Sequence, residues 1–119
     1  YYKLLKKINS KKVDILNTAR IAGIMASKKT SELIPLCHQL NLEKVDINSN
    51  FLESENCIIV KSTSIASDKT GVEMEALVAT TIASLTIYDM LKAVDKKIKI
   101  SDIWLDYKDG GRSGKFVRD

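Results

Sequence analysis

One segment of the chain, residues 76–94, carries apolar residues around the whole helical circumference and contains neither Gly nor Pro. A helix that is apolar on all sides is buried on more than one side. The segment is too short, and too interrupted by Thr, Ser, Asp and Lys, for a bilayer span. We therefore expect a helix with one face on its own sheet and another on a neighbouring subunit, and no membrane association.

The first third of the chain predicts a strand and two helices. Residues 1–8 mix aromatic and apolar residues with lysines, which weakly indicates an edge strand. Apolar residues at helical spacing predict a helix over residues 14–26. A shorter helix follows over residues 28–34 and ends at Pro35, the only proline.

Alternation of period two, although imperfect, predicts strands over residues 43–51 and 57–67, joined by a turn at residues 53–56. The long helix follows, and residues 99–107 predict a last strand. The order is that of the ferredoxin-like βαββαβ arrangement, an α+β fold whose antiparallel sheet has its helices packed on one face. Such a fold does not by itself name a function.

Composition describes a single domain over residues 1–119 that oligomerisation would help to stabilise. The net charge of +4 favours an anionic partner such as a phosphorylated metabolite, nucleic acid or an acidic surface. Two cysteines make no disulfide framework, so we expect a reducing compartment. Because the chain starts without Met, we expect that an upstream segment is missing.

Charged residues lie at the two ends of the long apolar helix. Glu73 and Glu75 suit the positive end of the helix dipole, and Asp89 and Lys92 form a pair near its other end. The ordinary interpretation is that the two glutamates stabilise the positive end of the helix dipole and that Asp89 and Lys92 form a surface ion pair. Asp89 follows Glu75 by fourteen residues, about 21 Å along the axis, so one pocket that uses both ends requires two antiparallel helices about a two-fold axis.

Other residues with reactive side chains admit two interpretations each. His38, the only histidine, is either a structural residue or a general acid or base near neutrality. Cys37 is more typical of a small buried residue than of a nucleophile, and one His with two Cys falls short of a zinc signature. The glycine-rich residues 110–115 either wrap phosphates or form a mobile tail.

Lysines occur at several element boundaries, and most lysines are solvated surface residues. This applies to Lys12, Lys28 and Lys108. Lys92 differs because it lies in an otherwise apolar segment, where it could bind a phosphate, or act as acid or base if its surroundings lower its pKa.

These residues occur in longer runs that closely resemble the molybdenum cofactor biosynthesis protein C family, the cyclic pyranopterin monophosphate synthases. The runs are T-A-R-I-A-G-I-M-A-S-K-K-T (residues 18–30), S-E-L-I-P-L-C-H (31–38), K-T-G-V-E-M-E-A-L (69–77), L-T-I-Y-D-M-L-K-A-V (85–94) and G-G-R-S-G (110–114). They follow the family's order and spacing.

The resemblance implies a specific reaction and assembly. A lyase would convert (8S)-3',8-cyclo-7,8-dihydroguanosine 5'-triphosphate to cyclic pyranopterin monophosphate, a pterin of molybdenum cofactor biosynthesis, with release of diphosphate. The family is a homohexamer, a trimer of dimers, with active sites at the dimer interface. It would lie in the cytoplasm of a bacterium, or in the mitochondrial or plastid matrix of a eukaryote.

The resemblance also implies roles for individual residues. Asp89 matches the position assigned as catalytic, and its proton transfers would be shared by Lys92, Lys12 and His38. The implied substrate-binding residues are Leu36, Cys37, His38, Glu73, Met74, Glu75, Lys28 and Lys108. No resident metal or established cofactor is implied, although Mg²⁺ could accompany the triphosphate.

The sequence departs from the family pattern at three positions. Gln39 replaces a proline after His38, Val13 replaces a glycine after Lys12, and Arg112 replaces the commoner lysine. The first two changes alter backbone freedom without removing a functional group. The third keeps the charge and changes the donor geometry.

Two other classes of function were weighed against the synthase. A nucleic-acid-binding module usually exposes stacking aromatic residues, whereas aromatics are only 6% here and the two central strands contain only Phe51. A structural subunit without activity would not need His38, Asp89 and Lys92 together. Both alternatives are therefore less favoured, and we expect a small-molecule substrate and no nucleic acid.

Overall fold

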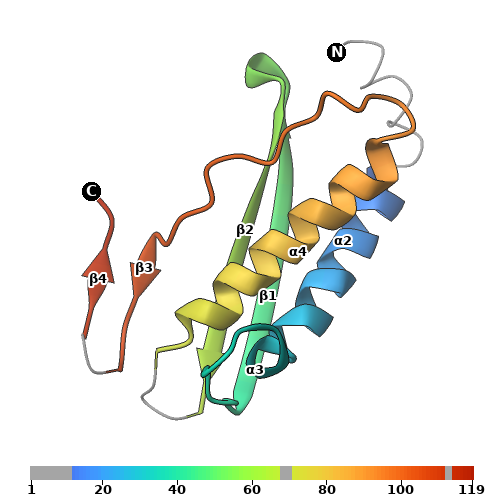
Figure 1. Ribbon diagram of the computed structural model, residues 1–119. Helices are drawn as coiled ribbons and strands as arrows, with labels where there is room; N and C mark the ends of the chain where they lie inside the picture. The colour runs from blue at the N-terminus through green and yellow to red at the C-terminus, as the bar shows by residue number, and fades with distance from the viewer. Residues whose placement is uncertain (1–11, 68–70, 112–113) are drawn as a thin grey trace.

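The computed structural model describes residues 12–67, 71–111 and 114–119 (Figure 1). The strand predicted for residues 1–8 lies outside these ranges. The elements are α2 (Lys12–Ser27), α3 (Thr30–Leu33), β1 (Leu42–Leu52), the 3-10 turn η1 (Glu53–Glu55), β2 (Cys57–Ala66), α4 (Glu73–Leu91), β3 (Tyr107–Lys108) and β4 (Phe116–Val117). The predicted helices and the two central strands are confirmed, with ends that differ by a few residues.

A long antiparallel hairpin forms the sheet. β1 and β2 pair from Leu42 opposite Ala66 to Leu52 opposite Cys57. Asn56 closes the turn with φ 57°, a left-handed conformation that asparagine tolerates better than most residues. Along β2, half-buried and exposed residues alternate strictly, so one face of the hairpin carries Ile58 and Val60 toward the core. This is the period-two pattern of a sheet covered on one side.

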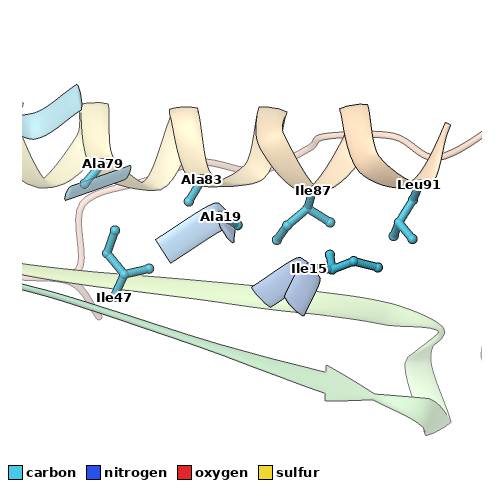
Figure 2. Close-up of a cluster of buried hydrophobic side chains, with 7 residues drawn as sticks. All are labelled: Ile15, Ala19, Ile47, Ala79, Ala83, Ile87 and Leu91. Carbon is cyan, nitrogen blue, oxygen red and sulfur yellow. The ribbon is translucent and has the colours of Figure 1, made fainter. Parts of the chain in front are cut away.

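The two long helices, α2 and α4, lie side by side on that face of the hairpin (Figure 1). Figure 2 shows the core that they enclose, with the α4 side chains pointing toward α2 and the strands. Its fully buried members are Ile15, Ala19, Ile47, Ala79, Ala83, Ile87 and Leu91. Phe51 packs on the edge of this cluster and is therefore not presented for base stacking.

Small residues allow α2 and α4 to approach closely. A Cβ atom added to Gly23 would meet the carbonyl oxygen of Ala79 at 2.7 Å and the Cβ of Ala83 at 3.2 Å, and would clash with the side chain of Ile47. Gly23 is therefore required by the distance between the helix backbones.

The predicted strand over residues 99–107 is wrong except for its last residue. Residues 99–106 form no strand, and Tyr107–Lys108 pairs with Phe116–Val117 in a separate two-stranded sheet. The physical reason is that the segment meets no strand partner among the residues that the structure describes. Its polar groups are satisfied by C-terminal residues, since the backbone N–H of Arg118 donates to Asp106 O at 2.8 Å and its Nε donates to Leu105 O at 2.7 Å.

The fold class is therefore α+β, with an antiparallel hairpin covered by helices on one face. In the described part of the chain, α4 alone is long and apolar enough to cross a membrane. Five of its apolar residues are nevertheless buried inside the protein: Val78, Ala79, Ala83, Ile87 and Leu91. Packing in the core thus accounts for this part of its apolar composition.

We expect Gly23→Ala to destabilise the fold by about 1–3 kcal/mol, the usual cost of overpacking. Alanine has the higher helix propensity, by about 1 kcal/mol, so propensity alone predicts the opposite sign. Urea unfolding would measure the free energy of unfolding. Asn17→Ala, at an exposed position of α2, is the matched control and should leave stability nearly unchanged. A Gly23→Ala variant as stable as the parent would contradict the close helix contact.

Candidate active site

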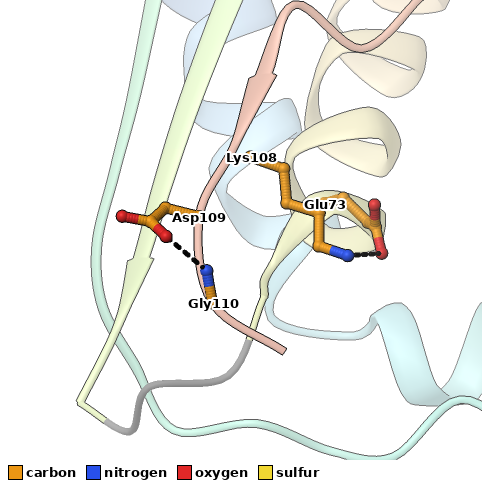
Figure 3. A network of polar contacts seen from close by, with 4 residues as sticks. All are labelled: Glu73, Lys108, Asp109 and Gly110. Atoms are coloured by element: carbon orange, nitrogen blue, oxygen red, sulfur yellow. Dashed lines mark hydrogen bonds and ion pairs between the residues drawn. The ribbon is translucent and has the colours of Figure 1, made fainter. Parts of the chain in front are cut away.

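The start of α4 and the end of β3 come together in a charged cluster. Lys108 reaches across the first turn of α4, and its Nζ lies 3.6 Å from Oε1 of Glu73 (Figure 3). The Lys108 side chain is only 10% exposed. A charge this shielded needs a partner, and Glu73 supplies one while also suiting the positive end of the helix dipole.

A glycine turn holds this cluster against the helix start. Gly110 and Gly111 have φ values of 92° and 79°, which other residues rarely adopt. Asp109 accepts a hydrogen bond from the backbone N–H of Gly110 at 2.9 Å, and its carboxylate points away from Lys108 (Figure 3). A Cβ on Gly111 would lie 3.3 Å from the nitrogen of Gly71. The first two residues of the glycine-rich segment therefore pack against the start of α4.

Glu75, one residue beyond Met74, is the most buried carboxyl group in the described part of the chain, with 3% of its surface exposed. Burial raises the pKa of Glu75, and the charge of Glu73 acts in the same direction, while a hydrogen bond from its own backbone opposes them. A carboxyl group with a raised pKa holds its proton to higher pH, so it can donate a hydrogen bond as well as accept one.

Cys37 lies near Glu75. Burial raises the pKa of the Cys37 thiol, and the negative charge of Glu75 raises it further. Because the thiolate is the nucleophilic form, these surroundings disfavour nucleophilic chemistry. This agrees with the prediction that Cys37 is not a nucleophile.

Buried hydroxyl groups fix the loop that carries Cys37. The Ser27 hydroxyl donates to Ile24 O at 2.7 Å and the Thr30 hydroxyl donates to Ser27 O at 2.8 Å, and both side chains are almost fully buried. These bonds set the angle between α2 and α3. The loop that follows presents Leu36 and His38 to solvent, on the same side as the start of α4.

A second group lies at the other end of α4. Nζ of Lys92 is 2.9 Å from Oδ1 of Asp89, and both side chains are more than half exposed. The hydrogen bond that Lys92 donates to Asp89, and then the charge of Asp89, raise the pKa of Lys92. In the isolated chain Lys92 is therefore a cation suited to phosphate, and not the lysine of lowered pKa that the sequence also allowed.

The structure brings together some of the predicted site residues and separates others. Glu73, Glu75, Cys37 and Lys108 gather at the start of α4, whereas Asp89 and Lys92 lie about 21 Å along the same helix. Lys28 borders a cleft of about 350 Å³, beside Leu42 and Val45. Lys12 begins α2, and its side chain lies outside the described residues.

Another cleft, of about 530 Å³, includes Tyr88 and Leu91 in its wall, next in sequence to Asp89 and Lys92. It is formed between β2, the end of α4 and residues 97–101, with Ile58, Ile87 and Leu91 in its wall. None of the predicted site residues lines it. Its wall mixes apolar side chains with polar ones, among them Asp95, Lys97 and Lys99. We place the chemistry at the two ends of α4, where the predicted site residues lie.

Sequence reasoning missed the part played by Gly71, which lets Lys108 pass within van der Waals distance of the backbone. A Cβ at this position would meet Cε of Lys108 at 2.9 Å. A glycine two residues before a helix with glutamates at its first and third positions was the available signal.

Comparison with known proteins gives consistent results. The sequence model of the MoaC family matches residues 1–111. A protein of Heliobacterium modesticaldum named cyclic pyranopterin monophosphate synthase is 52% identical over 108 residues, which cover 91% of this chain and 68% of that protein. Proteins of the same name from Syntrophomonas wolfei and Campylobacter jejuni are 53% and 50% identical, covering 92% and 98% of this chain and 69% and 74% of their own lengths. Matches of this extent, with the motifs in order, establish that the chain belongs to the MoaC family.

Proposed function

We propose that this chain acts as a cyclic pyranopterin monophosphate synthase through an active site shared between two copies. The predicted family is confirmed, and relatives at about 50% identity are named as this enzyme, which supports the function in molybdenum cofactor biosynthesis. The reaction converts (8S)-3',8-cyclo-7,8-dihydroguanosine 5'-triphosphate to cyclic pyranopterin monophosphate and diphosphate, as a lyase.

The observation that supports a shared site is the separation of two chemically complementary groups along α4. Carboxyl groups and Lys108 lie at its start, and Asp89 with Lys92 lies at its end. A small substrate does not span about 21 Å of helix. Two antiparallel copies related by a two-fold axis bring the start of one helix to the end of the other.

Exposed apolar residues support the same arrangement. Leu85, one helical turn before Asp89, is 52% exposed, and Ile21 and Met25 on α2 are exposed to a similar degree. Exposed apolar residues in such number on two adjacent helices are typical of a surface that is covered by another chain. We infer dimers of this kind, assembled in threes into a hexamer.

The residue types suit the proton transfers of the reaction. Opening and reclosing the guanine-derived ring requires repeated proton transfer, which we assign to Asp89, Lys92 and Lys12 of one copy with His38 of the other, because α2 begins beside the end of α4 (Figure 1). Glu73 and Glu75 would accept hydrogen bonds from the ring nitrogens, and Met74 lies between them. The protonated form of Glu75 adds a donor.

The cyclic phosphate requires a separate displacement. A ribose hydroxyl attacks the α-phosphorus, a new P–O bond forms, the bond to the β-phosphate oxygen breaks, and diphosphate leaves with that electron pair. Lys108, Lys92 and Lys28 would stabilise the charge on the departing group. Any Mg²⁺ would arrive with the triphosphate, because no cluster of three potential ligands lies within the described ranges.

The ferredoxin-like arrangement is part of the same proposal. The described elements supply its helix, strand, strand, helix centre in order, with both helices on one face of the hairpin.

Asp89→Asn should lower turnover by at least about a hundredfold, because the amide keeps the shape and cannot transfer a proton. The assay would follow diphosphate release and pterin formation from the cyclised dihydroguanosine triphosphate. Asp119→Asn, a change at an exposed carboxylate in the C-terminal residues, is the control and should turn over normally. Undiminished turnover in Asp89→Asn would remove the proposed role of Asp89.

Lys92→Ala should lower turnover by about a hundredfold while the dissociation constant of the triphosphate rises less than about tenfold, since an exposed cation adds little to affinity. Single-turnover kinetics and calorimetry would separate the two effects. Lys61→Ala, at an exposed position on the uncovered face of β2, should change neither. Parental rates in Lys92→Ala would refute the assignment.

Glu75→Gln should raise thermal stability at neutral pH and lower turnover. Because the pKa of Glu75 in the folded state lies above its ordinary value of 4.5, the folded chain binds this proton more tightly than the unfolded chain. Its contribution to stability is thus full below pH 4.5 and is lost as pH rises through the raised pKa.

Melting temperatures of Glu75→Gln and the parent should therefore converge at low pH and separate as pH rises. Glu43→Gln, at an exposed position, is the control and should follow the parent at every pH. A Glu75→Gln variant that is less stable than the parent at pH 7 would show that the ionised carboxylate stabilises the fold.

A further inference from the structure

The turn between α3 and β1 holds a leucine in a conformation that leucine rarely adopts. The backbone N–H of Cys37 donates to Ile34 O at 3.3 Å, so Pro35 and Leu36 are the central residues of a tight turn. Leu36 has φ 64°, in the left-handed region. Glycine or asparagine is preferred at this turn position, because a side chain with Cβ crowds the backbone there.

The Leu36 side chain gains nothing from its own chain. Its relative exposure is 101%, the highest among the exposed large apolar residues of the described ranges. Backbone strain and full exposure of an apolar side chain both disfavour leucine at this position in an isolated copy. An interaction outside the single chain would account for both features.

The position of the turn indicates where that interaction lies. In Figure 1 the segment between α3 and β1 runs beside the start of α4, and α3 itself contacts that helix. In the antiparallel pair described above, the start of one α4 meets the end of the other. Two exposed apolar residues of α4 lie close to Asp89 at that end: Met90 follows it directly, and Leu85 lies four residues before it on the same side of the helix.

We propose that Leu36 is a positioning residue that packs against the exposed apolar surface around Leu85 of a second copy. The contact would carry His38 of one copy to Asp89 and Lys92 of the other. This inference rests on the shared site of the proposed function. Leucine offers no hydrogen bond to a phosphorylated, nitrogen-rich substrate, whereas Leu85, Ile21 and Met25 offer a matching apolar surface, so the second copy is the occupant to which we commit.

The test is Leu36→Gly, studied in the full chain without substrate by analytical ultracentrifugation across a dilution series. The dissociation constant between copies should rise roughly a hundredfold to ten-thousandfold, the range expected when a two-fold pair loses two buried leucine side chains. The dissociated chain should unfold at the same or a higher temperature, because glycine accepts the left-handed conformation. Turnover should fall at low enzyme concentration and recover as the concentration is raised.

Leu36→Met is the matched control, since it keeps an apolar side chain of similar volume, and its dissociation constant should stay within about threefold of the parent value. Leu36→Asn provides a second variant that tolerates the turn and removes the apolar contact, so it should behave like Leu36→Gly.

A parental dissociation constant in both Leu36→Gly and Leu36→Asn would overturn the inference, whatever happens to turnover. A raised KM at every enzyme concentration with unchanged assembly would overturn it too, because Leu36 would then contact substrate. The absence of turnover in the parent would instead count against the proposed function, and it would leave the measured dissociation constants unaffected.

Discussion

The close approach of α2 to α4 is the contact on which the rest of the structure depends. Gly23 faces the backbone of α4 near Ala79 and Ala83, where no side chain fits between the helices. This contact leaves Ile15 to fill the space beside Ile87 and Leu91 (Figure 2). Close packing of this kind transmits small changes of position, because interiors have few voids to absorb them.

Both ends of the candidate site follow from that contact. At the start of α4, the helix position determines where Glu73 meets Lys108 and where Glu75 lies beside the loop of Cys37. At its end, the same straight helix sets the place of the Asp89–Lys92 pair. The charged groups thus depend on an apolar contact in which none of them takes part.

Much of this fold could be predicted from sequence because local patterns decide it. The alternation along β2, although imperfect, and the mainly apolar sequence of α4 each favour one kind of element. The segment before β3 could not be predicted in the same way. Its residues favour a strand, but a strand also needs a neighbour, and Trp104, Asp106 and Arg118 bond to one another instead.

The candidate site also has features that could be predicted from the sequence and features that could not. Motif positions predicted site roles for Glu73, Glu75, Asp89 and Lys92, since residue type limits the chemistry available to them. The small exposed fraction of Lys108, the burial of Glu75 and the left-handed backbone of Leu36 depend on segments distant in sequence. No local pattern encodes them.

The distance between the two ends of α4 also has a genetic meaning. In a pair of chains that share their sites, each site takes its carboxyl groups from one chain and its Asp89 from the other. A chain damaged only at the start of α4 and a chain damaged only at its end can therefore form a mixed pair with one intact site. In such a mixed pair both damaged helix ends belong to one site, and the other site is built from two undamaged ends. Two alleles that are each inactive alone would therefore restore activity when they are expressed together.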